Sequence, residues 1–126
     1  MNKGRVLVVD DEKEVCHLIK DMLENKGYEA LTAYDGEEGL KKAVAEHPNL
    51  VLLDVMLPGI DGFEVLDRLK RDSNTRSLPV LMVSAKRDSD SLFKARDLGS
   101  DDYITKPFTV QELLKAVVMY INLCRV

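Results

Sequence analysis

Acidic, hydroxyl and basic residues of this chain stand where short apolar runs end. Asp10 and Asp11 follow the first such run, Asp54 follows another, Ser84 closes a third, and Lys106 comes after a short mixed segment. Carboxylates that hold a divalent cation, with a lysine opposite, are the groups that proteins use to transfer a phosphoryl group, because both cations neutralise charge on its oxygens. If the fold brings these five residues together, they indicate phosphoryl chemistry.

The kind of cation follows from the side chains available. Carboxylates that lie close together repel one another, and at least one of them keeps its proton unless a cation intervenes. None of the candidate ligands is a histidine or a cysteine. Oxygen ligands alone favour Mg²⁺, or Mn²⁺ in its place. The expected cofactor is therefore a hard divalent ion.

Five segments have the apolar pattern of β-strands. Residues 6–9, 50–53 and 80–83 are continuous apolar runs, which are typical of parallel strands buried on both faces. Residues 28–33 alternate, and residues 102–105 are short and mixed, so these two segments predict edge strands. Three buried strands and two edge strands indicate a parallel sheet that is covered on both sides.

Five amphipathic segments follow the strands and predict helices. They cover residues 12–26, the segment from the N-cap Asp35 to before Pro48, the segment after Asp61 and Gly62, residues 88–98, and the segment from the capping box Thr109–Glu112 to about residue 124. The fourth has the thinnest apolar stripe. The inward faces are expected to include Leu18, Val44, Leu92 and Val118, one on each of the first, second, fourth and fifth helices.

Strict alternation of strand and helix predicts an α/β, doubly wound (βα)5 fold. In this three-layer sandwich, a five-stranded parallel sheet of order 2-1-3-4-5 lies between two layers of helices. Ligands bind such sheets at the carboxyl ends of the strands, where the strand order reverses. Each candidate residue alone has an ordinary explanation as a helix cap or a loop residue. Packing does not require all of them at this one edge, so their coincidence favours a functional site.

Four segments, in order across essentially the whole chain, resemble the receiver domains of bacterial two-component response regulators, which have a flavodoxin-like fold. They are Val8–Asp11, Leu53–Gly62, Val83–Ala85 and Asp101–Phe108. The resemblance implies one receiver domain over residues 1–126 that accepts a phosphoryl group from a histidine kinase and switches a binding surface. It fits a stand-alone regulator as well as the receiver part of a larger regulator or hybrid kinase.

The resemblance also implies roles for the acidic residues. Asp54 would be the nucleophile and phosphoacceptor. Asp11, Asp54 and the backbone carbonyl of Met56 would bind Mg²⁺ directly, and Asp10 would act through water. The expected phosphodonor is a sensor histidine kinase or a phosphotransfer protein.

Four further residues would respond to the phosphoryl group. The resemblance implies that Lys106 pairs with its oxygens and that Pro107 follows a cis peptide bond that aims the lysine. Ser84 would donate a hydrogen bond to it, and Tyr103 would then swing inward. The signal would leave through the fourth helix, the fifth strand and the fifth helix. Ser84 stands where threonine is commoner in the family, and this departure leaves the chemistry intact.

Composition excludes some classes of partner. The chain has 126 residues, as expected for one domain, and a formal net charge of −4, so it has no electrostatic basis for binding nucleic acid or an anionic membrane by itself. No apolar run has the length of a membrane span, and a cytoplasmic location is expected. An unknown effector domain or target protein would receive the signal, and the domain would be a monomer or a weak phosphorylation-dependent dimer. Cys16 and Cys124 are expected to lie too far apart for a disulfide.

Two other functions remain open on the residues alone. An aspartate-nucleophile phosphohydrolase also uses a doubly wound sheet, Mg²⁺ and a lysine, but it carries its nucleophile on the first strand and has an acid two residues later. That enzyme would leave the Lys106-Pro107 turn unexplained. A scaffold with a degenerate site is disfavoured by the intact acidic set. The expected function is a phosphorylation-controlled binding module and not an enzyme.

Overall fold

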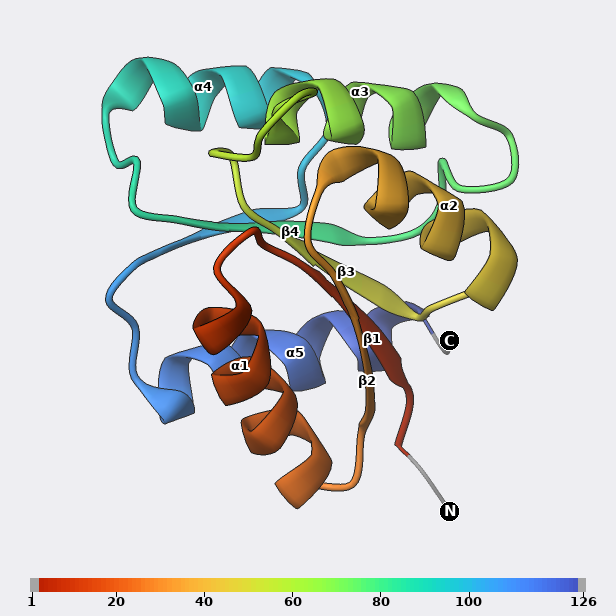
Figure 1. Ribbon diagram of the computed structural model, residues 1–126, viewed down its shortest axis with the longest axis vertical. Helices are drawn as coiled ribbons and strands as arrows, with labels where there is room; N and C mark the ends of the chain where they lie inside the picture. Colours follow the sequence, from red (N-terminus) through yellow and green to blue (C-terminus); the bar gives the residue numbers. More distant parts are fainter. Residues whose placement is uncertain (1–2, 125–126) are drawn as a thin grey trace.

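The computed structural model describes the backbone of residues 3–124 and the side chains of residues 3–122. Strands and helices alternate strictly along the chain (Figure 1). The elements are β1 (Arg5–Val9), α1 (Lys13–Asn25), β2 (Glu29–Ala33), α2 (Gly36–Glu46), β3 (Leu50–Leu53), α3 (Gly62–Arg71), β4 (Val80–Ser84), α4 (Ser89–Asp97), β5 (Asp102–Thr105) and α5 (Val110–Cys124). The expectation for the Cys16–Cys124 pair lies outside the described residues, because the side chain of Cys124 is not among them.

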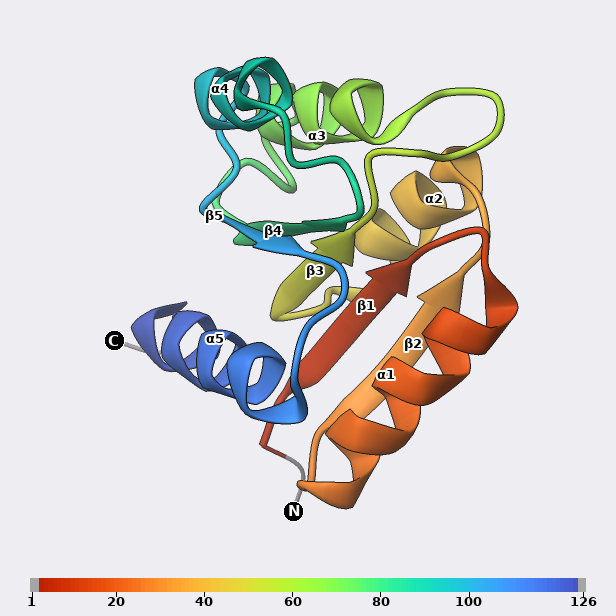
Figure 2. The same ribbon diagram turned by 90° about the vertical axis from the view of Figure 1, so that its left-hand side faces the viewer.

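The five strands form one parallel sheet of order β2-β1-β3-β4-β5, which confirms the predicted topology (Figure 2). Every residue of β3 and β4 is buried, as continuous apolar runs predict for strands covered on both faces. The edge strands β2 and β5 are only partly buried. The order reverses between β1 and β3, so the carboxyl ends of these two strands flank the expected ligand-binding crevice.

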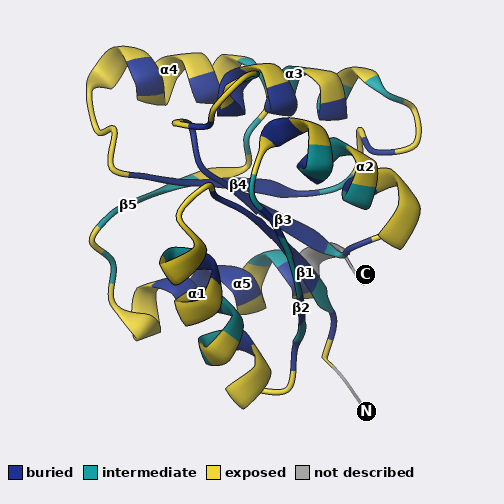
Figure 3. Ribbon diagram, in the orientation of Figure 1, coloured by how far each residue is buried: buried dark blue, intermediate teal, exposed yellow. Residues whose placement is uncertain are grey.

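Helices cover both faces of the sheet, with α1 and α5 on one face and α2, α3 and α4 on the other (Figures 1 and 2). Alternate residues of β1 feed the two resulting cores: Val6 and Val8 contact the α1/α5 side, and Leu7 and Val9 contact the α2/α3/α4 side. Figure 3 shows the buried strands between helices whose outer faces are exposed. Among the described residues, no helix has both the length and the apolar character that a membrane span requires.

Local signals at the helix starts are confirmed. The side chain of Asp35 accepts the N–H of Glu38 at 2.8 Å, and the side chain of Asp61 accepts the N–H of Glu64 at 3.0 Å. The predicted capping box forms in both directions between Thr109 and Glu112, at 3.1 and 3.4 Å. These caps fix where the chain leaves the carboxyl edge of the sheet and enters α2, α3 and α5.

Four predicted inward residues are wrong, because their side chains lie largely in solvent: Leu18, Val44, Leu92 and Val118 are 53, 43, 38 and 42 % exposed. Smaller residues of these helices are buried: Ala43 on α2 and Ala95 on α4, which were predicted to face inward, and Cys16 on α1 and Ala116 on α5, which were not. Small side chains let the helices approach the sheet closely. On these helices, the apolar stripe in the sequence is therefore wider than the helix face that packs against the sheet.

Gly62, at the start of α3, allows this helix to touch the end of β3. A Cβ atom at Gly62 would lie 2.1 Å from the backbone oxygen of Asp54 and 2.7 Å from the Cα of Val55. These neighbours are backbone atoms, which cannot rotate away. The absence of a side chain at position 62 is therefore required by the segment that carries Asp54.

We predict that Gly62→Ala lowers the free energy of unfolding by roughly 2–3 kcal/mol, because the overpacked backbone must shift. Gly59→Ala is the matched control: no atom lies within 4 Å of its Cβ position, so only its positive φ of 72° opposes the change, at about 1 kcal/mol. Urea denaturation followed by circular dichroism measures both variants. Equal losses in the two variants would contradict the close approach at Gly62.

Candidate functional site

The carboxyl ends of the strands bring the predicted polar residues to one edge of the sheet. Backbone hydrogen bonds continue one residue past the strands: the N–H of Asp54 donates to Val9 at 3.0 Å, and the N–H of Lys106 donates to Ser84 at 2.9 Å. The parallel register therefore places the residues that follow β1 and β3 side by side, and places Lys106 beside the end of β4 at the same edge. A cavity of about 730 Å³ opens at this edge and is lined by Asp11, Glu12, Asp54, Met56 and Lys106, among others.

Lys106 lies between two buried carboxylates. Its Nζ donates to Asp10 Oδ2 at 2.6 Å and to Asp54 Oδ2 at 3.0 Å. Asp10 and Asp54 are 3 and 5 % exposed, so water contributes little to the solvation of their charges. These contacts join residues 96 and 52 positions apart in the sequence, and they depend on the strand order.

Burial and pairing act on these groups in opposite directions. Burial alone lowers the pKa of Lys106, but its hydrogen bonds and charge attraction to Asp10 and Asp54 outweigh burial and hold the pKa above its usual value. Burial raises the pKa of Asp10, despite its hydrogen bonds from Lys106 and from the backbone of Glu12. The raised pKa of Lys106 and the raised pKa of Asp10 are consistent with each other, because one ammonium group faces two buried carboxylates and cannot fully offset both of their charges. A negative charge is left over in the pocket, and a bound cation would neutralise it.

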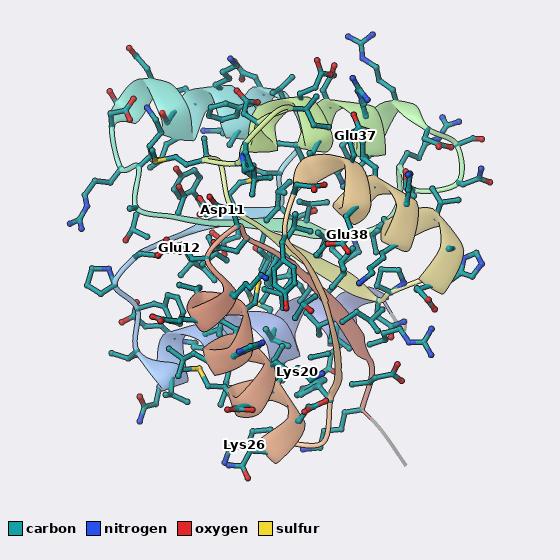
Figure 4. All side chains as sticks on the ribbon, viewed as in Figure 1. Asp11, Glu12, Lys20, Lys26, Glu37 and Glu38 are labelled. Atoms are coloured by element: carbon teal, nitrogen blue, oxygen red, sulfur yellow. The ribbon has the colours of Figure 1, made fainter. Side chains whose placement is uncertain are left out.

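The acidic group contains a residue that the sequence reasoning missed. Oxygen atoms of Asp10, Glu12 and Asp54 lie within 4.8 Å of one another. Asp11, which was predicted as a direct metal ligand, is exposed and lines the same cavity outside this group. Figure 4 shows Asp11 and Glu12 together where the chain passes from β1 into α1. Glu12 had been read only as the first residue of the helix, although an acid two positions after Asp10 was a signal for it.

Ser84 and Tyr103 meet the loop that follows β4. Ser84 is fully buried, and its Oγ accepts the N–H of Lys86 at 3.3 Å. The hydroxyl of half-buried Tyr103 donates to the carbonyl of Lys86 at 2.6 Å, and burial raises the pKa of Tyr103. Arg87 donates to the carbonyl of Lys106 at 2.9 Å. The loop therefore joins the end of β4 to the end of β5.

Pro107 and Met56 are the two remaining predicted residues, and Met56 lines the cavity. The Lys106–Pro107 peptide bond is cis, in agreement with the expectation for Pro107. Met56 donates its N–H to Asp54 Oδ1 at 3.1 Å, and its side chain is 56 % exposed. Asp54 thus has one oxygen held by the backbone and the other by Lys106.

Comparison with known proteins identifies the family. The model of the response regulator receiver domain matches residues 6–118. The chain belongs to this family. It is a receiver domain of two-component response regulators, and the predicted function class is confirmed.

Related proteins agree with this assignment. The receiver domain is 47 % identical over 113 residues to the alkaline phosphatase synthesis transcriptional regulatory protein PhoP of Bacillus subtilis, covering 90 % of this chain and 46 % of that protein. It is 38 % identical over 120 residues to the protein PilG of Pseudomonas aeruginosa, covering 93 % of this chain and 87 % of that protein. The chain thus spans about half the length of PhoP and of similar regulators.

Solved structures show the same fold. The crystal structure of a CheY-like response regulator receiver domain protein from Methanospirillum hungatei matches with a TM-score of 0.91 and 30 % identity, covering 96 % of this chain and 95 % of that chain. The receiver domain of the Francisella response regulator 1452 matches with a TM-score of 0.89 and 32 % identity, covering 95 % of this chain and 98 % of that one. The confirmed strand order is therefore shared with receiver domains of known structure.

Cys16 of the receiver domain is buried near the start of α1, next to Asp10 of the acidic group. Its Sγ donates to the backbone carbonyl of Asp10 at 3.2 Å. Burial, with the nearby Asp10 charge, raises the pKa of the thiol to about 11. Since the thiolate is the reactive form, this cysteine is shielded both sterically and chemically.

We predict that native Cys16 reacts with iodoacetamide at pH 8.5 about 100-fold more slowly than it does in the unfolded chain, because two pKa units separate the thiolate fractions. The measurement uses a Cys124→Ser background and quantifies the alkylated mass over time, with and without guanidinium chloride. Comparable rates in the two conditions would contradict the buried position of the thiol.

Proposed function

We propose that this receiver domain accepts a phosphoryl group on the side chain of Asp54 from the phosphohistidine of a sensor histidine kinase or a phosphotransfer protein in the cytoplasm. One observation carries the proposal: the Asp54 carboxylate lies at the end of a central strand, lines the cavity and contacts Lys106 at 3.0 Å. The Asp54 carboxylate is therefore accessible to a phosphodonor and held in a fixed orientation, and a nucleophile requires both.

The transfer is a displacement at phosphorus. An oxygen of Asp54 attacks the phosphorus atom and forms the new P–O bond, while the P–N bond to the donor imidazole breaks and its electron pair stays on the ring nitrogen. Lys106, held against Asp10, then pairs with a phosphoryl oxygen in place of the Asp54 oxygen that it now contacts. Ser84 accepts a backbone N–H and keeps its own hydroxyl proton with which to donate to another phosphoryl oxygen.

We assign the metal to Asp11, Asp54 and the backbone carbonyl of Met56, with Asp10 acting through water. The residues fit a hard cation, because two buried carboxylates share one lysine and Asp11 and Met56 line the same cavity. Mg²⁺ or Mn²⁺, when bound, would neutralise negative charge on the phosphoryl oxygens. Glu12 lies close enough to act on the same ion.

The phosphohydrolase alternative would make Asp10 the nucleophile, with Glu12 two residues later as its acid. Asp10 does not suit this role: its side chain is buried, pairs with Lys106 at 2.6 Å, and is not among the described residues that line the cavity. Asp54 has the open position that Asp10 lacks. The geometry therefore favours a phosphoacceptor over an enzyme that hydrolyses small phosphoesters.

We predict that acetyl phosphate with Mg²⁺ adds one phosphoryl group to the wild-type chain, detected by intact-mass spectrometry. Asp54→Asn should abolish the added mass, because the amide is not a nucleophile, and chelation of Mg²⁺ should reduce it strongly. Asp35→Asn, at a helix cap outside the cavity, is the control. Full phosphorylation of Asp54→Asn, or steady turnover of small phosphoesters by the wild type, would contradict the proposal.

For the output we propose a surface formed by α4, β5 and α5. It exposes the large apolar side chains of Phe93 and Met119, which are 60 and 45 % exposed, and a cavity of about 350 Å³ beside Tyr103. The hydroxyl of Tyr120 on α5 lies within hydrogen-bonding distance of the Asp101 carbonyl, at 3.0 Å, and of Asp102 Oδ2, at 3.1 Å. Phe93 is the better apolar anchor for an effector domain or target protein.

Two kinds of output fit the relatives. Regulators such as PhoP, of which the chain spans about half, favour an attached effector region, and PilG, of which it spans most, favours a separate target protein. We propose that the domain itself contacts no nucleic acid or membrane. We propose that in isolation it is a monomer or a weak phosphorylation-dependent dimer.

We predict that beryllofluoride with Mg²⁺, which imitates the phosphoryl group, shifts the amide NMR signals of residues 84–105 and the exposed side of α5 more than those of α2. The reason is that Ser84, Lys86 and Tyr103 form a connected path to that surface. Asp54→Asn is the control and should show no such shifts. Changes confined to α1 and α2 would place the output elsewhere.

A further inference from the structure

Glu12 has a position that the proposed chemistry does not yet use. Its Oε1 lies 3.9 Å from Nζ of Lys106, and its carboxylate belongs to the group with Asp10 and Asp54. Unlike those two, its side chain is 65 % exposed, and it lines the cavity that leads to Asp54. Figure 4 shows it where the β1–α1 turn enters α1. Glu12 therefore stands at the mouth of the site.

The backbone holds Glu12 in this place. Its N–H donates to Asp10 Oδ1 at 2.9 Å, which ties the turn to the buried carboxylate. The residue is also the N-cap of α1, directly before Lys13, so its backbone cannot move without moving the helix. Its side chain makes no capping hydrogen bond and is available to face the cavity.

Among the described residues, the charge of Glu12 is compensated only in part, by Lys106 at 3.9 Å. Lys106 is nearer to Asp10 and Asp54 than to Glu12. Of the other lysines that line the cavity, Lys86 lies 4.0 Å from Asp88, and Lys94 lies over the ring of Phe63 at 4.6 Å. A donor that enters the cavity therefore passes a carboxylate that is exposed and largely uncompensated.

We propose that Glu12 is an electrostatic selectivity residue: its charge strengthens binding of the divalent cation and slows the entry of small, highly charged phosphodonors. Both effects follow from one negative charge at the cavity mouth, which attracts a cation and repels an anion. A phosphohistidine on a docked protein is held by contacts outside the cavity, which offset the repulsion, whereas a free acyl phosphate has no such contacts. Glu12 thus biases Asp54 toward a protein donor. The inference rests on the proposed function of Asp54.

The test replaces the charge and keeps the shape, with Glu12→Gln. The matched control is Glu14→Gln, which makes the same change in net charge on the exposed first turn of α1, outside the residues that line the cavity. Mg²⁺ affinity is measured first, without any donor, by isothermal titration calorimetry at low ionic strength. The rate of phosphorylation of Asp54 is then measured at saturating Mg²⁺ with acetyl phosphate, a dianion, and with phosphoramidate, which carries one net negative charge.

Glu12→Gln should weaken Mg²⁺ binding by about threefold to tenfold and raise the rate with acetyl phosphate by a similar factor, with a smaller rise for phosphoramidate. Raising the salt to about 0.5 M should shrink both differences, because the charges are screened over a few ångströms. Glu14→Gln should change each quantity by less than about twofold. A purely structural role of Glu12 would not move metal affinity and donor rate in opposite directions.

Two results would overturn the inference while leaving Asp54 as the phosphoacceptor. One is a Glu12→Gln variant that equals the wild type in both measurements, and the other is a Glu14→Gln variant that reproduces its changes. A decrease in both Mg²⁺ affinity and donor rate would assign Glu12 to the metal shell or to the fold, and would also reject the selectivity role. No reaction of the wild type with either donor would instead overturn the proposed function, and this inference with it.

Discussion

The ammonium group of Lys106, held between the buried carboxylates of Asp10 and Asp54, is the interaction on which the rest of this receiver domain depends. Asp10 and Asp54 would repel one another in a pocket from which water is almost excluded, and the lysine offsets only part of that repulsion. The pocket is left with an excess of negative charge. On the proposed function, a divalent cation would offset this charge together with the charge of the phosphoryl group.

Strand order is what makes this cluster possible. β1, β3 and β5 lie far apart in the sequence, and only a parallel sheet presents all their carboxyl ends at one edge. The strand order also accounts for the glycine at position 62. The helix α3 packs on the sheet and begins against the backbone of Asp54, where a side chain would not fit. The cost of gathering charge at this edge is offset elsewhere by the two apolar cores on either face.

The sequence was most informative where a local rule acts on few residues. Continuous apolar runs identified the buried strands, and Asp35, Asp61 and Thr109 identified helix starts, because each signal depends on neighbours in the chain. The errors lie where tertiary geometry decides. Leu18 and Val118 are apolar and correctly spaced, yet the close approach of the helices left them outside. Tertiary geometry also brings Glu12 close to Asp10 and Asp54, which the sequence reasoning missed, while Asp11 as a metal ligand stays a prediction.

The connection from the site to the output surface runs through backbone atoms of a single loop. Lys86 donates its N–H to Ser84 and accepts the hydroxyl of Tyr103, while Arg87 donates to the carbonyl of Lys106. If a phosphoryl group on Asp54 accepts the Ser84 hydroxyl, as proposed, it would draw toward Asp54 the same oxygen that accepts the N–H of Lys86. The loop, Tyr103 and the start of α4 must then rearrange together, since α4 has few buried side chains to resist the movement. The thin apolar stripe that the sequence shows for α4 matches its few buried side chains, and this supports the proposal that α4 is the element that phosphoryl binding shifts.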